Sequence, residues 1–462
     1  MSSSQPATDL REAYRVCEPK PLNGEDFDRY YEPLLGEDDF DAVKAIGASL
    51  FVQEPREHKT FFVAGHRGCG KTTELNLLVK NWCEDYHVIY IEADKISNIN
   101  NIDYIDIYLL AALYINIHIN TYEISIEPNI IKQFEDVLAT IIHCVIEPSP
   151  DSEIEDKVSS IKSIAATENF KWVESSTDFS LLLAGLLLKT SELKTTNRFY
   201  ISYNLAGGKP KNIITYRGAF VTYEDDFKNV FKVLLNDFNK ALKKQKNTYK
   251  GILLIIDNLD RCSLNTAKAI FNDEIEKLFE IGCNAIYTAP IYYLNQLQKT
   301  NINQQDHFLI PLSNIYKFSK NQLNPQTNIL SFQKLIALLR RRIDLNVLFD
   351  SDRVILELVM SSGGNLMHLM VLLRQAYLSA IGRNRRKASK TDVNYAIEQL
   401  QISFERHASN DEFYEDLVMS FYDKTLPEGD SGLLALERGM LLQYRDKKKD
   451  LFFPQPVVLQ MD

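Results

Sequence analysis

The residues best suited to chemistry form a glycine-rich stretch in the first fifth of the chain. Gly65 is followed, after four residues, by Gly70, Lys71 and Thr72. This spacing lets backbone N–H groups surround the phosphates of a nucleotide. An apolar run at 60–64 precedes the stretch and a helical pattern follows it, as a phosphate-binding loop requires. The residues predicted to bind nucleotide are Gly65, His66, Arg67, Gly68, Cys69, Gly70, Lys71, Thr72 and Thr73.

Each residue type in this loop has a chemical reason to be there. Glycine permits backbone conformations and a close phosphate approach that a Cβ atom would prevent. Lys71 supplies a mobile positive charge for the outer phosphates, and the Thr72 hydroxyl can bind Mg²⁺. The alternative is a glycine-rich turn that only caps a helix. The strand before the loop and the helix after it favour binding of ATP with Mg²⁺.

A second candidate site follows the apolar stretch 251–256, which leads into Asp257 and then Asp260. Such a run predicts a strand buried on both faces, with a carboxylate at its C-terminal end. Ligands of open parallel sheets bind at that end. Asp257 is therefore predicted to reach the Mg²⁺ held by Thr72, directly or through water. Asp260 is a candidate for orienting the attacking water, and the alternative is an ordinary strand ending in a polar turn.

The third candidate, Thr288, ends another predicted buried strand. Its hydroxyl could sense the γ-phosphate or hold the attacking water. The alternative is a strand that simply ends in a hydroxyl. Together with Lys71, Asp257 and Asp260, Thr288 completes the set of predicted catalytic residues, while Thr72 and Asp257 are the predicted metal ligands.

A parallel sheet is needed to position these residues. Predicted strands at 60–64 and 87–92 flank the helix after the phosphate loop, and a strand–helix–strand unit of this kind indicates parallel pairing. Apolar stretches at 251–256, 283–288 and 307–313 complete five strands. The sequence therefore predicts an α/β, P-loop NTPase-like fold with a five-stranded, mostly parallel sheet.

Composition patterns predict four parts along the chain. A helical N-terminal segment covers 1–59, the nucleotide-binding core 60–320, a helical lid 321–408 and a winged-helix-like module 409–462. The lid follows from helical apolar spacing and the module from two helices before a hairpin. An acidic and polar insertion at about 148–211 interrupts the core.

Composition also limits the class of protein. The 462 residues are 45% hydrophobic and 25% charged, which is typical of globular proteins. The net charge of -10 argues against a surface devoted to duplex nucleic acid. The six cysteines form no CxxC pair, so neither a zinc site nor a disulfide framework is indicated. No signal peptide begins the sequence, and the longest apolar run is about half of a bilayer span, so we expect a cytoplasmic location and no membrane.

The two motifs and the lid resemble the additional-strand P-loop NTPases, the AAA+ and STAND ATPases, over about residues 40–450. The loop Gly-His-Arg-Gly-x-Gly-Lys is similar to bacterial STAND proteins, and the arrangement as a whole resembles archaeal-ATPase-like and origin-recognition-type members. The run from Asp257 to Cys262, Asp-x-Leu-Asp-Arg-Cys, resembles the KAP group of NTPases. The resemblance implies an ATPase that places the phosphate loop on ATP and Mg²⁺, Asp257 on the metal and Thr288 at the sensor position.

The chain departs from the AAA+ pattern at Asn258, where many AAA+ motors have a catalytic glutamate. Asparagine cannot act as a general base. Either Asp260 takes this role, as the STAND pattern implies, or hydrolysis is slow.

A second departure lies in the lid. The run Ser362-Gly-Gly-Asn-Leu366 resembles the second sensor motif, but Met367 or His368 stands at the usual arginine position. Arg374 is a candidate replacement, and a surface or core-edge arginine is the alternative. One of the arginines at 340–342 is a candidate for reaching a neighbouring subunit's γ-phosphate, against the alternative of a solvated helix.

The leading hypothesis is an ATP-dependent molecular switch with slow hydrolysis, whose nucleotide state controls self-association or engagement of a separate effector. By resemblance, its setting would be bacterial signalling or antiviral defence. The alternative is a DNA-binding initiator- or loader-like ATPase, supported by lysines at 447–449 and the basic segment 383–390. A nucleotide-bound scaffold without turnover is the third possibility.

Overall fold

The structure is a computed structural model of the chain. It describes residues 5–35, 41–54, 57–95, 99–145, 220–293, 307–318, 325–406, 411–446 and 449–460. The predicted insertion at about 148–211 lies outside these residues, as do Lys447 and Lys448 of the predicted hairpin turn.

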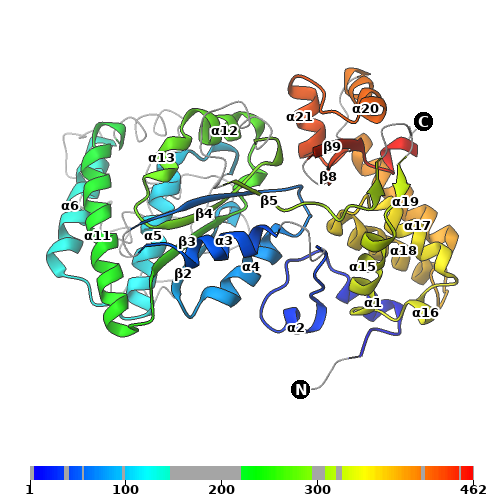
Figure 1. Ribbon diagram of the computed structural model, residues 1–462, viewed down its shortest axis with the longest axis horizontal. Helices are drawn as coiled ribbons and strands as arrows, with labels where there is room; N and C mark the ends of the chain where they lie inside the picture. The colour runs from blue at the N-terminus through cyan, green and yellow to red at the C-terminus, as the bar shows by residue number, and fades with distance from the viewer. Residues whose placement is uncertain are drawn as a thin grey trace, which may run out of the picture. The chain divides into compact units, whose positions relative to one another are not determined.

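A five-stranded sheet in the order β2-β3-β4-β1-β5 carries the α/β fold (Figure 1). Its strands are β1 (Thr60–Ala64), β2 (Tyr86–Glu92), β3 (Gly251–Asp257), β4 (Asn284–Ala289) and β5 (His307–Leu309). β3 pairs in parallel with both β2 and β4. The predicted sheet of five strands is confirmed, although β5 is shorter than the apolar run that predicts it.

Burial explains why these strands can be recognised in the sequence. Every residue of β1, β3 and β4 is buried, and strands covered on both faces have continuous apolar runs instead of alternation. The strand β2 lies at the edge of the sheet and alternates between buried and half-buried residues over most of its length. In the parallel register, Glu92 at the end of β2 lies opposite Asp257 at the end of β3.

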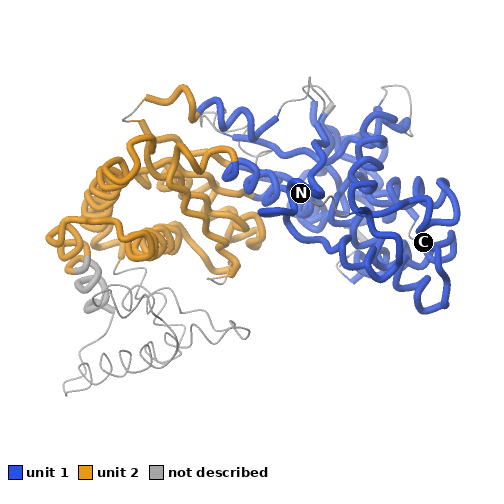
Figure 2. Tube along the Cα trace, turned by 90° about the horizontal axis from the view of Figure 1, so that it is seen from below, with its two compact units in different colours: residues 1–49, 63–80, 290–462 blue, residues 50–62, 81–289 orange. Residues whose placement is uncertain are grey.

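The chain folds into two compact units (Figure 2). Unit 1 contains residues 1–49, 63–80 and 290–462, and unit 2 contains residues 50–62 and 81–289. The strand β1 and the helix after the phosphate loop, α4 (Lys71–Trp82), each continue from one unit into the other. The four predicted parts with boundaries near 59, 320 and 408 follow composition and stay a prediction.

In unit 2, helices cover the sheet. The helix α5 packs against β2, and α11 packs against α6 and β3 (Figure 1). The helices are α5 (Tyr104–Thr121), α6 (Pro128–Val145), α11 (Glu224–Gln245), α12 (Leu264–Lys268) and α13 (Ile275–Phe279), with the π-helix η4 (Ala269–Asp273) and the 3₁₀ turns η1 (Ala93–Lys95), η2 (Ile99–Asn101) and η3 (Leu259–Arg261).

In unit 1, a helical bundle is centred on α18, which packs against α1, α17 and α19. The helices are α1 (Leu10–Val16), α2 (Asp26–Tyr30), α3 (Ala42–Phe51, with its last two residues in unit 2), α15 (Ile329–Arg340), α16 (Leu345–Leu348), α17 (Asp352–Ser361), α18 (Leu366–Gly382) and α19 (Lys390–Glu405). A small hairpin, β6 (Tyr316–Lys317) with β7 (Gln326–Thr327), precedes α15. The helices α15 to α19 lie within the helical lid predicted for residues 321–408.

The C-terminal module of unit 1 has the predicted order of two helices and a hairpin. It consists of α20 (Asp411–Asp423), α21 (Asp430–Glu437), β8 (Leu441–Asp446), β9 (Lys449–Pro454) and the turn η6 (Val458–Gln460). The helix α20 packs against α21 and β9, and β8 pairs antiparallel with β9. Within the described part of the chain, no helix combines the length and apolarity needed to cross a bilayer.

Candidate functional site

The phosphate loop connects β1 to α4 and lies in unit 1. Gly68 and Gly70 have φ angles of 86° and 108°, in the region that residues with a side chain rarely adopt. Alternation of left-handed and ordinary residues turns consecutive N–H groups toward one side and forms a concave anion site. The backbone of the loop therefore fits the phosphates of a nucleotide.

Lys71 is buried at the start of α4 and braces this loop. Its ammonium group donates hydrogen bonds to the carbonyl oxygens of Gly65 at 2.8 Å and His66 at 2.9 Å. A lysine that contacts phosphate would have to exchange these carbonyls for phosphate oxygens. The conformation of the loop and the position of the ammonium are therefore linked.

The loop between α17 and α18 rests on the phosphate loop. The Asn365 side-chain amide donates to the Arg67 carbonyl at 2.9 Å, and the Met367 backbone N–H donates to the Gly68 carbonyl at 3.1 Å. A Cβ atom at Gly68 would lie 2.3 Å from the Cβ of Met367, so only glycine fits there. This segment is the predicted second-sensor motif, and its contacts with the phosphate loop run through backbone and amide groups.

His66 connects the phosphate loop to the C-terminal hairpin. It is 1% exposed, and its Nε2 accepts a hydrogen bond from the Gln443 backbone N–H on β8 at 2.7 Å. An accepting Nε2 requires the neutral ring with its proton on Nδ1. Burial, helped by the nearby charge of Lys71, lowers the pKa of His66 to about 3. The histidine therefore contributes no positive charge to the loop near neutral pH.

The other loop residues differ in their surroundings. The Arg67 side chain is exposed, Cys69 is buried and Thr72 is half-buried in the first turn of α4. The Thr73 hydroxyl accepts from the Leu22 backbone N–H at 3.1 Å and so supports the N-terminal segment. Glu74 follows, and burial raises the pKa of its carboxyl group to about 7.

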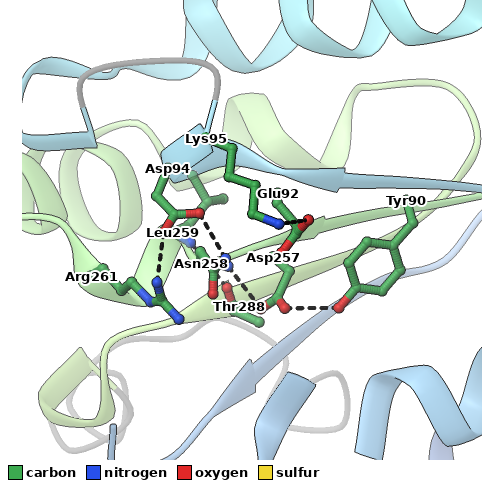
Figure 3. A network of polar contacts seen from close by, with 9 residues as sticks. All are labelled: Tyr90, Glu92, Asp94, Lys95, Asp257, Asn258, Leu259, Arg261 and Thr288. Atoms are coloured by element: carbon green, nitrogen blue, oxygen red, sulfur yellow. Dashed lines mark hydrogen bonds and ion pairs between the residues drawn. The ribbon is translucent and has the colours of Figure 1, made fainter. Parts of the chain in front are cut away.

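In unit 2, Asp257 ends β3 with a fully buried carboxylate. Its Oδ2 accepts from the Tyr90 hydroxyl at 2.7 Å, and its Oδ1 accepts from the Asn258 backbone N–H at 2.7 Å (Figure 3). Burial and the charge of Asp257 raise the pKa of Tyr90, so the phenol stays a donor. The predicted metal aspartate is thus oriented by its own unit.

Asn258, which stands in place of a glutamate, has a structural role of its own. Its φ angle is 68°, a left-handed conformation that asparagine tolerates better than most residues. Its side-chain amide donates to Asp94 Oδ1 at 2.7 Å, and Arg261 donates to Asp94 Oδ2 at 2.6 Å (Figure 3). The network joins the turn after β3 to η1, which follows β2.

The remaining predicted catalytic residues lie beside this network. Thr288 is fully buried in β4, and its hydroxyl oxygen accepts from the Leu259 backbone N–H at 3.1 Å. Asp260 is half-buried in η3. Unit 2 therefore brings Asp257, Asp260 and Thr288 together, and unit 1 holds the phosphate-loop residues from Gly65 to Thr73. The roles assigned to these residues stay predictions.

The lid arginines have local contacts in unit 1. Arg341 forms an ion pair with Glu32 at 2.7 Å. Arg342 is buried and donates to two backbone carbonyls at 2.9 and 3.2 Å. The guanidinium of Arg374 lies 4.0 Å from the centre of a tyrosine ring on α1. Arg340 is exposed.

Sequence reasoning missed Tyr90, Asp94, Asn365 and Gln443. A signal existed for Asp94, because it follows the second predicted strand at the edge where ligands of parallel sheets bind. Asn365 lies within the predicted sensor motif but has no obvious partner in the sequence. Tyr90 alternates with apolar residues in β2 like any strand tyrosine, and Gln443 is 377 residues from His66.

Each unit offers a donor that suits a hard cation. The Thr72 hydroxyl in unit 1 and the Asp257 carboxylate in unit 2 are each an oxygen ligand of a kind that Mg²⁺ accepts, and Mg²⁺ usually keeps waters and phosphates as further ligands. Among the described residues, no group of three or more histidines, cysteines or acidic residues forms a metal site by itself.

Comparison with known proteins identifies the family. A family model described as KAP family P-loop domain matches residues 44–285. A search of curated proteins found no match. Among solved structures, the chain is similar to the Aeropyrum pernix ORC2 protein in its ADPNP-ADP complexes, at 12% identity and a TM-score of 0.37, with 94% of each chain covered. It is also similar to Cdc6p from Pyrobaculum aerophilum, at 10% identity and a TM-score of 0.34, covering 95% of this chain and 96% of that one.

The family model spans the phosphate loop, β1 to β3 and the Asp257 network, and ends within β4. It covers more than half of the 462 residues, whereas the structural likenesses are too low in score to support an argument. The chain therefore belongs to the KAP family of P-loop NTPases.

Proposed function

We propose that this protein is an ATP-dependent molecular switch in which the phosphate loop reports nucleotide binding to the lid and the C-terminal hairpin. One observation supports this most strongly. Three successive loop residues, His66, Arg67 and Gly68, each accept a hydrogen bond from a distant segment of unit 1. A loop held in this way cannot change conformation without disturbing the segments that hold it.

The coupling would begin at Lys71. Phosphate oxygens carry formal charge and bind an ammonium group more strongly than neutral carbonyls do. Binding of ATP would therefore draw Lys71 away from the carbonyls of Gly65 and His66. The His66 carbonyl would then lose one of its donors and keep the bond from the Cys69 N–H at 3.1 Å, so its peptide would be less firmly held. The side chain of the same residue carries the bond to the hairpin.

Mg²⁺ would accompany ATP, with Thr72 and Asp257 as its protein ligands, and would offset the charge of the phosphates. Asp260 would orient water and Thr288 would respond to the γ-phosphate. Hydrolysis would be slow because Asn258 cannot accept a proton, and it would return the switch to its first state. The output would be self-association or engagement of a separate effector, in bacterial signalling or antiviral defence.

Nucleotide binding is tested by Lys71→Ala, with affinity for a fluorescent ATP analogue as the measurement. We expect a loss of at least about 10-fold, since a charge-assisted contact contributes on the order of 1.5–3 kcal/mol. Lys80→Ala is a matched control, because Lys80 lies on the same helix and pairs with Asp28 on the surface. Equal affinity of Lys71→Ala and the parent would refute nucleotide binding at this loop.

Switching is tested by hydrogen exchange of the backbone amides in β8 and β9, with and without ATP and Mg²⁺. We expect the Gln443 amide to exchange faster in the ATP-bound protein, because its acceptor on His66 moves. Particle size measured on the same samples tests self-association. Unchanged exchange throughout the hairpin at saturating ATP would contradict the switch.

The DNA-binding alternative has less support. The helix α21, which precedes the hairpin and would be the recognition helix of a winged module, contains no lysine or arginine between Asp430 and Glu437. Phosphate contacts require such residues and make binding salt-dependent. DNA retention that weakens with salt would revive this alternative.

A further inference from the structure

The hydrogen bond between Tyr90 and Asp257 joins two neighbouring strands at the predicted metal ligand. Tyr90 lies on β2, two residues before the register partner of Asp257 on the neighbouring strand. Its phenol reaches across to Asp257 Oδ2 at 2.7 Å, as Figure 3 shows. This length is typical of a well-formed hydrogen bond from a hydroxyl group to an oxygen.

The backbone around Asp257 is fixed by other groups. The side chain of Asn258 and that of Arg261 both bind Asp94, and the Leu259 N–H binds Thr288. These contacts hold the turn after β3, whereas two donors act directly on the carboxylate of Asp257. The Asn258 backbone N–H binds Oδ1 and the Tyr90 hydroxyl binds Oδ2, each at 2.7 Å. Of these two donors, Tyr90 is the one that a side-chain substitution can remove, and its loss would free Oδ2 to turn.

We propose that Tyr90 is a positioning residue that orients Asp257 for Mg²⁺ and thereby sets the Mg²⁺ concentration at which nucleotide binds tightly. The inference rests on the proposed function, in which Asp257 serves the metal. Carboxylates that bind metals are commonly held by a hydrogen-bonded outer residue, and loss of such a residue costs about 10–100-fold in metal affinity or activity.

Tyr90→Phe tests the proposal, because it removes the hydroxyl and keeps the ring. Tyr104→Phe is the matched control, since the Tyr104 hydroxyl donates to the carboxylate of Glu224 at 2.9 Å in the same unit. Affinity for a non-hydrolysable ATP analogue is measured while Mg²⁺ is titrated from zero. We expect Tyr90→Phe to raise the half-saturating Mg²⁺ concentration by about 10-fold and to leave the Mg²⁺-free affinity unchanged, whereas Tyr104→Phe changes neither.

A second comparison separates positioning from general damage. In an Asp257→Asn background, Tyr90→Phe should have no further effect on the Mg²⁺ titration, because the hydroxyl acts through the carboxylate. Additive effects in the double variant would overturn the proposal, as would a Tyr90→Phe titration identical to the parent's. An equal loss of Mg²⁺-free affinity would show a merely structural role. If the parent itself binds the analogue without responding to Mg²⁺, the proposed metal site fails and the inference fails with it.

Discussion

His66 lies in the phosphate loop and Asn258 follows the predicted metal aspartate, and each holds a buried or half-buried hydrogen bond. His66 accepts from the backbone of β8, and Asn258 donates to Asp94. Both partners are themselves polar groups that would otherwise lose hydrogen bonds on burial. At the residue scale, these side chains therefore join the phosphate loop to β8 and the turn after β3 to η1. Their contribution to stability can be measured separately from catalysis.

For His66→Ala, we expect a loss of unfolding free energy of about 1–3 kcal/mol, because the buried Gln443 N–H loses its acceptor. Urea unfolding without nucleotide measures the change. Arg67→Ala, with its exposed side chain in the same loop, should change stability by no more than about 0.5 kcal/mol. Equal losses in the two variants would show that the contact with β8 is not what stabilises this region.

For Asn258→Glu, we expect lower stability and no gain in ATP turnover. Glutamate would place a second carboxylate against Asp94 and would adopt the left-handed backbone less readily. The free energy of unfolding should fall by about 1–3 kcal/mol. Urea unfolding and steady-state phosphate release measure the two effects, and Asn258→Gly separates the backbone from the hydrogen bond. A stable Glu variant that turns over faster would show that Asn258 alone limits hydrolysis.

At the scale of elements, the segment between α17 and α18 joins the phosphate loop to neighbouring parts of unit 1. Tyr444 on β8 donates to the Gly363 carbonyl at 2.6 Å, and Gln455 after β9 donates to the Ser361 carbonyl at 2.8 Å. The same segment supplies Asn365 to the phosphate loop. The phosphate loop and the C-terminal hairpin therefore both contact the same short segment of the lid.

Gly364→Ala tests this shared segment. A Cβ atom there would lie 2.0 Å from the Ser313 carbonyl oxygen, and the φ angle of 77° disfavours alanine. We expect the free energy of unfolding, measured by thermal unfolding, to fall by more than about 1 kcal/mol. ATP binding should also weaken. Gly382→Ala is the control, since a Cβ at Gly382 would meet no atom within 4 Å. It should be neutral or stabilising by up to about 1 kcal/mol, and similar losses in both would contradict the argument.

The elements also show what the sequence could and could not predict. The strands β1, β3 and β4 were predictable because burial on both faces demands continuous apolar runs. The helices α2 and α16 were not, because five and four residues are too few to display a helical period.

The candidate site was likewise predictable only where it depends on local sequence. The spacing of Gly65, Gly70 and Lys71 depends on local geometry and is visible in the sequence. The bonds of His66 and Arg67 join segments 377 and 298 residues apart, so no local pattern records them.

At the scale of the whole molecule, histidines that are buried or half-buried predict sensitivity to acid. Burial lowers the pKa of His66 to about 3 and that of His87, His118, His307 and His368 to about 4. The unfolded chain, with histidine pKa values near 6.5, therefore takes up protons first as the pH falls. This part of the stability is complete above about pH 6.5 and is lost as the pH falls toward 4.

Urea unfolding at pH 7, 6 and 5 measures this loss, with a limiting slope of about 1.4 kcal/mol per pH unit for each histidine. Glu74 opposes it, because a carboxyl pKa raised to about 7 stabilises the folded state as the pH falls below 7. Replacing His87 with glutamine should reduce the slope by about one histidine's share. A flat profile from pH 7 to pH 5 would contradict the burial of these rings as neutral groups.

The order of the two units along the chain has a consequence for synthesis on the ribosome. Residues 63–80 belong to unit 1, but most of that unit follows residue 289, after all of unit 2. The phosphate loop leaves the ribosome 377 residues before the strand that binds His66, which at about 5–20 residues per second is a delay of roughly 20–75 seconds. Unit 2 can mature during this interval. The phosphate loop reaches its final contacts only after all of unit 2 and the strand β8 have been synthesised, so nascent chains should acquire ATP affinity abruptly once β8 has emerged.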